Sequence, residues 1–213
     1  QHERAAVLTL STLKFIISLR ANDYKVDDYS PKSNNPLSYN SYKNLFGSTR
    51  APSKAGHGIN VKQDPNSCHI AVLLNSNFYI LKVLTSKNEI IFNDLQLESI
   101  FKGLIANASA HYNELISDSF PIASISATNR KSWTVSRNLL SQNKINKENL
   151  DLIDTALFVL TLDSEESYLK DDNFPSSIAH GYSKIVNGIQ TGSGISRWYD
   201  KLQIIIAKNS KTC

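Results

Sequence analysis

The chain has 213 residues, a formal net charge of +4 at pH 7 and 41% hydrophobic residues. This length suffices for one domain with a sizeable core, and the composition is ordinary for a globular protein. Lys and Arg are spread along the chain without a basic tract, which argues against nucleic acid as a partner. No apolar run is long enough to cross a bilayer, so we expect no transmembrane segment in this chain.

The cysteines and histidines argue against two further kinds of site. There are two cysteines, Cys68 and the terminal Cys213, which is no disulfide framework and favours a reducing, intracellular compartment. None of the five histidines lies three or four residues from another, so we expect no metal site. The chain contains no Met and begins with Gln1, which leads us to expect its natural start elsewhere.

The first third of the chain predicts a helix, a long loop and a hairpin. Residues 3–20 are rich in Ala and Leu without Gly or Pro, and therefore predict a helix. Residues 21–67 are polar and broken by four prolines, which predicts a mostly irregular segment. Two branched and aromatic runs, 68–74 and 77–84, flank Asn75-Ser76 and predict a β-hairpin.

The rest of the chain alternates between expected helices and strands. We expect a helix capped by Asn93 or Asp94 and ending at Asn107, a short buried strand over 121–126, a helix over 129–140, a helix from Asn146, and strands over 158–163 and 201–208. The order predicts a mixed α/β fold, and residues 1–213 show no internal domain boundary.

Two motifs in the last quarter could carry chemistry, but each also has a purely structural interpretation. The Gly-rich run 188–194 lacks the endings of a phosphate-binding loop, so a flexible turn is the better interpretation. The cluster from Arg197 to Lys201 reads Arg-Trp-Tyr-Asp-Lys. Arg197 and Asp200 could form a buried pair that holds a site, or the cluster could be a capped strand entrance with Trp198 as its anchor. The residues alone favour the second interpretation.

The histidines predict no catalytic triad. His69 enters an apolar strand and is expected to be a satisfied core residue, whereas His57 and His180 are expected in surface loops. There is no Gly-x-Ser-x-Gly elbow either.

Six segments in order resemble the choline/carnitine O-acyltransferase family and span nearly the whole chain. They are Arg4-Ala5-Ala6; Pro36-Leu37, Tyr42, Leu45-Phe46 and Ser48–Pro52; His69–Val72 with Phe78-Tyr79; Thr128-Asn129-Arg130, Trp133 and Arg137; Asn146, Leu150, Ile153, Leu157-Phe158 and Leu162-Asp163; and Gly194 with Arg197–Lys201. The most diagnostic is the last, which resembles the family's arginine-tryptophan-aromatic-aspartate-lysine signature. Ser53 and Asn187 stand where the family usually has a glycine and a histidine.

The resemblance implies a chloramphenicol-acetyltransferase-like (CoA-dependent acyltransferase) domain, with a central mixed sheet and flanking helices, of which residues 1–213 are an incomplete part. It also implies a carnitine O-acyltransferase, with carnitine and acyl-CoA or CoA as substrates and no resident cofactor. The family's general base is a histidine that follows a glutamate after the last expected strand, beyond Cys213, so no catalytic residue is carried over to this chain. Arg197 and Asp200 are the expected supports of that histidine's strand.

Two other functions stay open at this point. The product could be a catalytically inactive remnant or scaffold, or an acyltransferase of the same fold with another acceptor alcohol. A continuation of the gene past Cys213 into a Glu-His motif would separate an enzyme from a remnant.

Overall fold

The computed structural model describes residues 1–23, 42, 44–53, 58–110, 122–163, 196–206 and 208. Its helices are α1 (His2–Arg20), α3 (Asp94–Ala110), α5 (Ile122–Ile125), α6 (Arg130–Leu140) and α7 (Lys144–Thr155). Its strands are β1 (Ser48–Pro52), β2 (Ile59–Gln63), β3 (His69–Leu74), β4 (Asn77–Lys82), β5 (Val159–Leu162) and β6 (Gln203–Ile206). The predicted mixed α/β class is confirmed.

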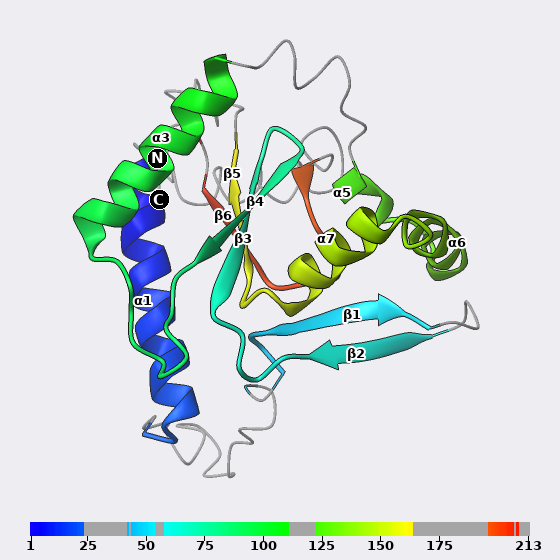
Figure 1. Cartoon of the computed structure of the whole chain (residues 1–213), viewed down its shortest axis with the longest axis horizontal. Helices are drawn as coiled ribbons and strands as arrows, with labels where there is room; N and C mark the ends of the chain where they lie inside the picture. The colour runs from blue at the N-terminus through cyan, green and yellow to red at the C-terminus, as the bar shows by residue number, and fades with distance from the viewer. Residues whose placement is uncertain are drawn as a thin grey trace, which may run out of the picture.

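A four-stranded mixed sheet lies between two groups of helices (Figure 1). Its order is β4-β3-β5-β6, with β3 antiparallel to β4 and parallel to β5, and β5 parallel to β6. Helices α1 and α3 cover one face, while α5, α6 and α7 lie on the other side. The described part of the chain is thus a three-layer arrangement of helices, sheet and helices.

Alternating side chains on β3 divide the core between the two faces. Ile70 and Val72 point to the α1 and α3 side, whereas Ala71 and Leu73 point to the α6 and α7 side, and all four are 0% exposed. A strand that is buried on both faces reads as a continuous apolar run, which is why this segment is recognisable in the sequence.

The predicted hairpin is confirmed, and its turn has the backbone that a two-residue hairpin needs. Asn75 and Ser76 have φ values of 49° and 63°, the left-handed conformation typical of type I′ turns. The strands on either side pair in antiparallel register from His69 with Lys82 to Leu74 with Asn77.

Asparagine caps begin three of the helices. Asn93 and Gln96 exchange side chain to backbone hydrogen bonds of 2.9 and 3.0 Å, a reciprocal capping arrangement ahead of α3. The Asn129 side chain accepts from Ser132 N and caps α6, which begins one residue after the predicted start at Asn129. Helix α7 begins two residues before the predicted Asn146, because the Asn143 side chain already accepts from the first backbone N–H groups of the helix.

The predicted buried strand over 121–126 is wrong, because residues Ile122–Ile125 form the short helix α5. Successive hydrogen bonds from Ser126 N to Ala123 O and from Ala127 N to Ser124 O continue it as tight turns. An apolar run this short has the same composition in a strand and in a helical turn, so periodicity does not distinguish them.

The prediction of an irregular segment over 21–67 is wrong for its second half. Strands β1 and β2 pair there in antiparallel register, from Ser48 with Gln63 to Pro52 with Ile59. Every residue of β2 is exposed, so this strand has no alternation of buried and exposed side chains that the sequence could reveal.

Among the described residues, no helix combines the length and the apolar character that a membrane span requires.

Gly47 joins the β1–β2 hairpin to the main sheet, and its surroundings leave no room for a side chain. Its φ is +66°, and a Cβ atom there would lie 2.4 Å from the carbonyl oxygen of Asp64. Its own N–H donates to Leu157 O at 3.0 Å, and its carbonyl accepts from Asp64 N at 2.8 Å, so the backbone is held on both sides.

We therefore expect Gly47→Ala to lower the free energy of unfolding of the full-length gene product by more than about 2 kcal/mol. Gly103 is the matched control, since it lies inside α3 and has no neighbour within 4 Å of an added Cβ. Gly103→Ala should instead gain about 0.5–1 kcal/mol from helix propensity. Denaturation midpoints measure the expected loss of stability in Gly47→Ala and the expected gain in Gly103→Ala. Equal midpoints for the two variants would contradict the assigned role of Gly47.

Candidate functional site

The turn that leads into β6 is the most deeply buried polar segment of the described structure. Arg197, Trp198, Asp200 and Lys201 are 1%, 0%, 1% and 8% exposed. Charged side chains are rarely buried unless they are paired, so Arg197, Asp200 and Lys201 must each have a partner that holds the side chain in place. This turn is also the segment with the strongest resemblance to an enzyme family.

The Asp200 carboxylate binds helix α6. Its two oxygens accept from Arg130 Nη1 at 2.7 Å and from the indole N–H of Trp133 at 2.5 Å. Its backbone carbonyl accepts from Arg50 N at 2.8 Å and from the Thr49 hydroxyl at 3.2 Å. Asp200 therefore ties the turn to α6 through its side chain and to β1 through its backbone.

Arg197 forms a separate ion pair. Its Nη2 donates to Asp163 Oδ2 at 2.6 Å, just after β5, and its Nη1 donates to Ser196 O at 2.9 Å. The suggested pair between Arg197 and Asp200 is thus wrong, since each binds a different partner. Both residues are buried and paired, as a supporting role requires, and the role itself stays a prediction.

Trp198 anchors the turn in the core. Its ring packs edge-to-face against Trp133, with centroids 5.6 Å apart, and against Phe78, with centroids 5.5 Å apart. The backbone N–H of Trp198 donates to the side-chain oxygen of Gln203 at 2.8 Å, and Gln203 is the first residue of β6. These contacts match the interpretation of a capped strand entrance with a tryptophan anchor.

Lys201 makes two bonds that the sequence did not indicate. Its Nζ donates to Ser48 O and to Asp154 O, both at 2.8 Å. Burial lowers the pKa of the Lys201 amine to about 8, although the charges of Asp154 and Asp64 oppose that shift. A protonated amine at this position must be stabilised by the two carbonyl oxygens, because water hardly reaches it.

Asp154 is the other functional candidate that sequence reasoning missed. Its carboxylate, 1% exposed, accepts from Arg137 at 3.1 and 2.5 Å and from Lys62 Nζ at 2.8 Å. The sequence feature that could have revealed Asp154 is its position next to the inward-facing Ile153 on α7, because an acidic side chain there needs a buried partner. The Arg137 guanidinium also lies 5.4 Å from the Trp133 ring centroid, which joins this group to the aromatic cluster.

Of the other predicted candidates, the structure describes His69. Its ring Nε2 lies 2.8 Å from Leu152 O, so it has the expected hydrogen-bond partner, but it is only partly buried and is not the core residue that we expected. His57, His180 and the Gly-rich run 188–194 lie outside the described residues. Within the described ranges, no three His, Cys, Asp or Glu side chains come together as metal ligands would.

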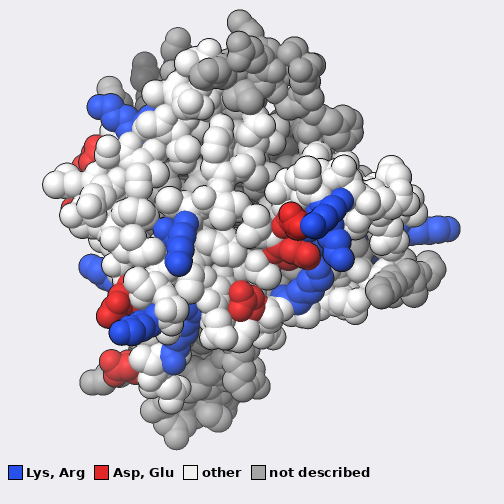
Figure 2. Space-filling view, in the orientation of Figure 1, with Lys and Arg blue, Asp and Glu red and all other residues white. Residues whose placement is uncertain are grey.

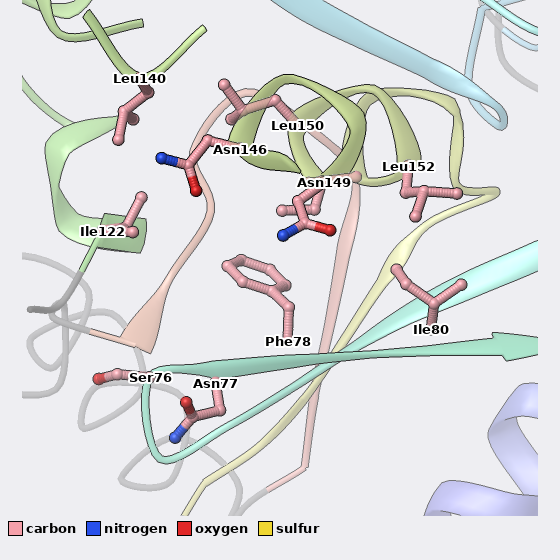
Figure 3. A pocket seen from close by; sticks show the side chains of 11 residues that line it. Ser76, Asn77, Phe78, Ile80, Ile122, Leu140, Asn146, Asn149, Leu150 and Leu152 are labelled. Carbon is pink, nitrogen blue, oxygen red and sulfur yellow. The ribbon is translucent and has the colours of Figure 1, made fainter. Parts of the chain in front are cut away.

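A pocket of about 260 Å³ lies between the β3–β4 hairpin and α7 (Figure 3). The described side chains that line it carry no charge, and Asn146 and Asn149 face Phe78 across it. Phe78 also contacts Trp198, so the pocket lies behind the aromatic cluster of the turn. A lining of amides and apolar groups suits neutral groups and offers no acid or base.

Charges of both signs are interspersed on the face that Figure 2 shows. The described residues drawn there form no broad patch of one sign that a highly charged partner would recognise.

The family model described as Choline/Carnitine o-acyltransferase matches residues 1–213. The chain belongs to this family. The six resembling segments and the buried turn are thus placed in a family of acyltransferases, and the resemblance is confirmed.

Three relatives show the range of names within the family. The chain is 35% identical to the "Putative mitochondrial carnitine O-acetyltransferase" of Saccharomyces cerevisiae, over 99% of this chain and 32% of that protein. It is 30% identical to human mitochondrial carnitine O-palmitoyltransferase 2, over 83% of this chain and 24% of that protein. It is 28% identical to chicken choline O-acetyltransferase, over 83% and 27%. The chain thus spans about a third or less of the length of these curated relatives.

Membership in the choline/carnitine O-acyltransferase family fits the mixed sheet and its flanking helices. The chloramphenicol-acetyltransferase-like arrangement, and the assignment of residues 1–213 to most of one family domain, stay predictions.

Proposed function

We propose that the gene product is a carnitine O-acyltransferase, which transfers an acyl group reversibly between CoA and carnitine inside the cell. The observation that carries this proposal is the family match over residues 1–213. The names of two of the relatives reported above, a carnitine O-acetyltransferase and a carnitine O-palmitoyltransferase, favour carnitine as the acceptor.

The proposed chemistry needs one general base and no acyl-enzyme. A neutral imidazole takes the proton of the carnitine hydroxyl as its oxygen attacks the thioester carbonyl carbon of acyl-CoA. The carbon–sulfur bond then breaks, and the CoA sulfur receives the proton from the imidazolium. Donors near the carbonyl oxygen stabilise the negative charge that develops there. CoA and its thioester are substrates, and no resident cofactor takes part.

The residues of this chain have a supporting role in the proposal. The histidine is proposed to follow Cys213 in the gene, beyond β6. Asp200 fixes the entrance of β6 against α6, and Arg197 fixes it against the end of β5. Catalytic groups must be held within about 0.5 Å of their productive geometry, and buried supports of this kind supply that rigidity.

Sequencing the transcript past the codon for Cys213 and assaying its full product test the proposal. The transcript should encode a Glu-His motif, and the product should release CoA from acetyl-CoA when carnitine is added. Replacing that histidine by Ala is the control, and it should abolish the release. A stop codon directly after Cys213 would contradict the proposal and favour an inactive remnant or scaffold.

A second acceptor, choline, is favoured by one observation, the match to chicken choline O-acetyltransferase. The same assay with choline in place of carnitine compares the two alcohols. If CoA is released with choline but not with carnitine, choline replaces carnitine as the proposed acceptor, and the proposed acyl transfer stands.

A further inference from the structure

Lys201 fixes the turn before β6 through its side chain, directly after Asp200. Its Nζ joins β1 at Ser48 O to the end of α7 at Asp154 O, with 2.8 Å to each carbonyl. These partners lie 153 and 47 residues away in sequence, so the contact is purely tertiary. An ammonium group that is 8% exposed gains little from water, and these two bonds therefore hold it in place.

Two consecutive residues thus hold the turn. Asp200 reaches α6 through its carboxylate and β1 through its backbone carbonyl, while Lys201 reaches β1 and α7 through its side chain. Strand β6 begins two residues later, at Gln203, and pairs with β5 in parallel register. Displacement of Lys201 would therefore shift the start of β6.

The charges around Lys201 keep it mainly protonated near neutral pH. The carboxylates of Asp154 and Asp64 favour the ammonium form, whereas burial opposes it and brings the pKa of the amine to about 8. The Asp154 charge is shared with Arg137 and Lys62, which bind its oxygens directly. The amine accordingly loses its proton within the range over which enzyme activity can be measured.

We propose that Lys201 is a positioning residue for the acyl transfer, an inference that rests on the proposed function. Its bonds to the Ser48 and Asp154 carbonyls set the path of β6, and with it the place of the histidine proposed to follow. Lys201 touches neither substrate, and it acts only through the backbone that leads to the base. A small misplacement of a general base is costly, since about 1 Å can reduce the rate about 100-fold.

The experiment compares three variants of the full-length gene product, with kcat and KM measured for acetyl-CoA and carnitine between about pH 6 and pH 10. Lys201→Met removes both donors at similar length, and should lower kcat about 100-fold while each KM changes less than about threefold. Lys201→Arg keeps donors that do not titrate, and should restore most of kcat at neutral pH. The wild type should lose activity above about pH 8, as the amine loses its charge, and Lys201→Arg should lack this loss.

Lys62→Met is the matched control, because Lys62 binds the same Asp154 from β2 but has no bond to the turn. Its effect on kcat should be about tenfold smaller than that of Lys201→Met. Equal effects, or a change in KM alone, would overturn the positioning role. If Lys201→Met does not fold, the Lys201→Arg profile decides, and an unchanged loss above pH 8 would count against the proposal.

An inactive wild type would contradict the proposed function and leave the positioning contact to be measured by itself. Amide hydrogen exchange over Gln203–Ile206 then compares the wild type with Lys201→Arg and Lys201→Met. Faster exchange in the Met variant alone supports the contact, whereas equal exchange in all three proteins overturns it.

Discussion

Replacing Asp200 by Asn is expected to destabilise the full-length gene product by about 3 kcal/mol and to lower its turnover. The carboxylate is 0% exposed and accepts from Arg130 Nη1 and Trp133 Nε1 at the same time. An amide presents one oxygen and one NH₂ group, so one of the two donors would face another donor. Arg130 is 29% exposed and keeps some hydration, which places the cost at the lower end of the range for breaking a buried pair.

The matched control is Asp151→Asn on the surface of α7. Asp151 is 55% exposed and lies 3.5 Å from Lys62, so its ion pair should contribute less than about 1 kcal/mol. Denaturation midpoints measure the stability of both variants, and kcat is measured well below their unfolding temperatures. Unchanged kinetics in a folded Asp200→Asn protein would refute the supporting role of Asp200.

Removal of the Trp198 side chain is expected to cost about 3–5 kcal/mol of unfolding free energy. The ring is 0% exposed and makes edge-to-face contacts with both Trp133 and Phe78. Trp198→Ala would leave a large cavity between the sheet and helix α6, beneath the turn that leads to β6. The shift of the denaturation midpoint in the full-length gene product measures this loss.

Two Phe variants separate packing from hydrogen bonding in this cluster. The indole N–H of Trp198 has no partner among the described residues, so Trp198→Phe should lose only part of the packing. The indole N–H of Trp133 binds Asp200, and Trp133→Phe would leave that buried carboxylate one donor short. Trp133→Phe should therefore be the more destabilising of the two, by about 1–2 kcal/mol. The reverse order would contradict the assigned bond to Asp200.

Local patterns in the sequence predict the elements that have a strong period or a clear cap. Helix α1 and the β3–β4 hairpin follow from alanine density and an Asn-Ser turn, and α6 begins within one residue of its predicted start. Strand β2 and helix α5 escape prediction for opposite reasons. Strand β2 is exposed at every residue, and α5 is four residues long, so neither carries a usable period.

The candidate site likewise has a part that the sequence predicts and a part that it does not. The sequence by itself determined the family and the mixed α/β class and singled out residues 197–201, because motif spacing and residue type are properties of the chain alone. Only the tertiary structure decided the partners. Arg197 binds Asp163 rather than Asp200, and Lys201 binds carbonyl oxygens on β1 and α7. Every residue offers one backbone carbonyl as an acceptor, so no sequence pattern marks the two that a buried amine will meet.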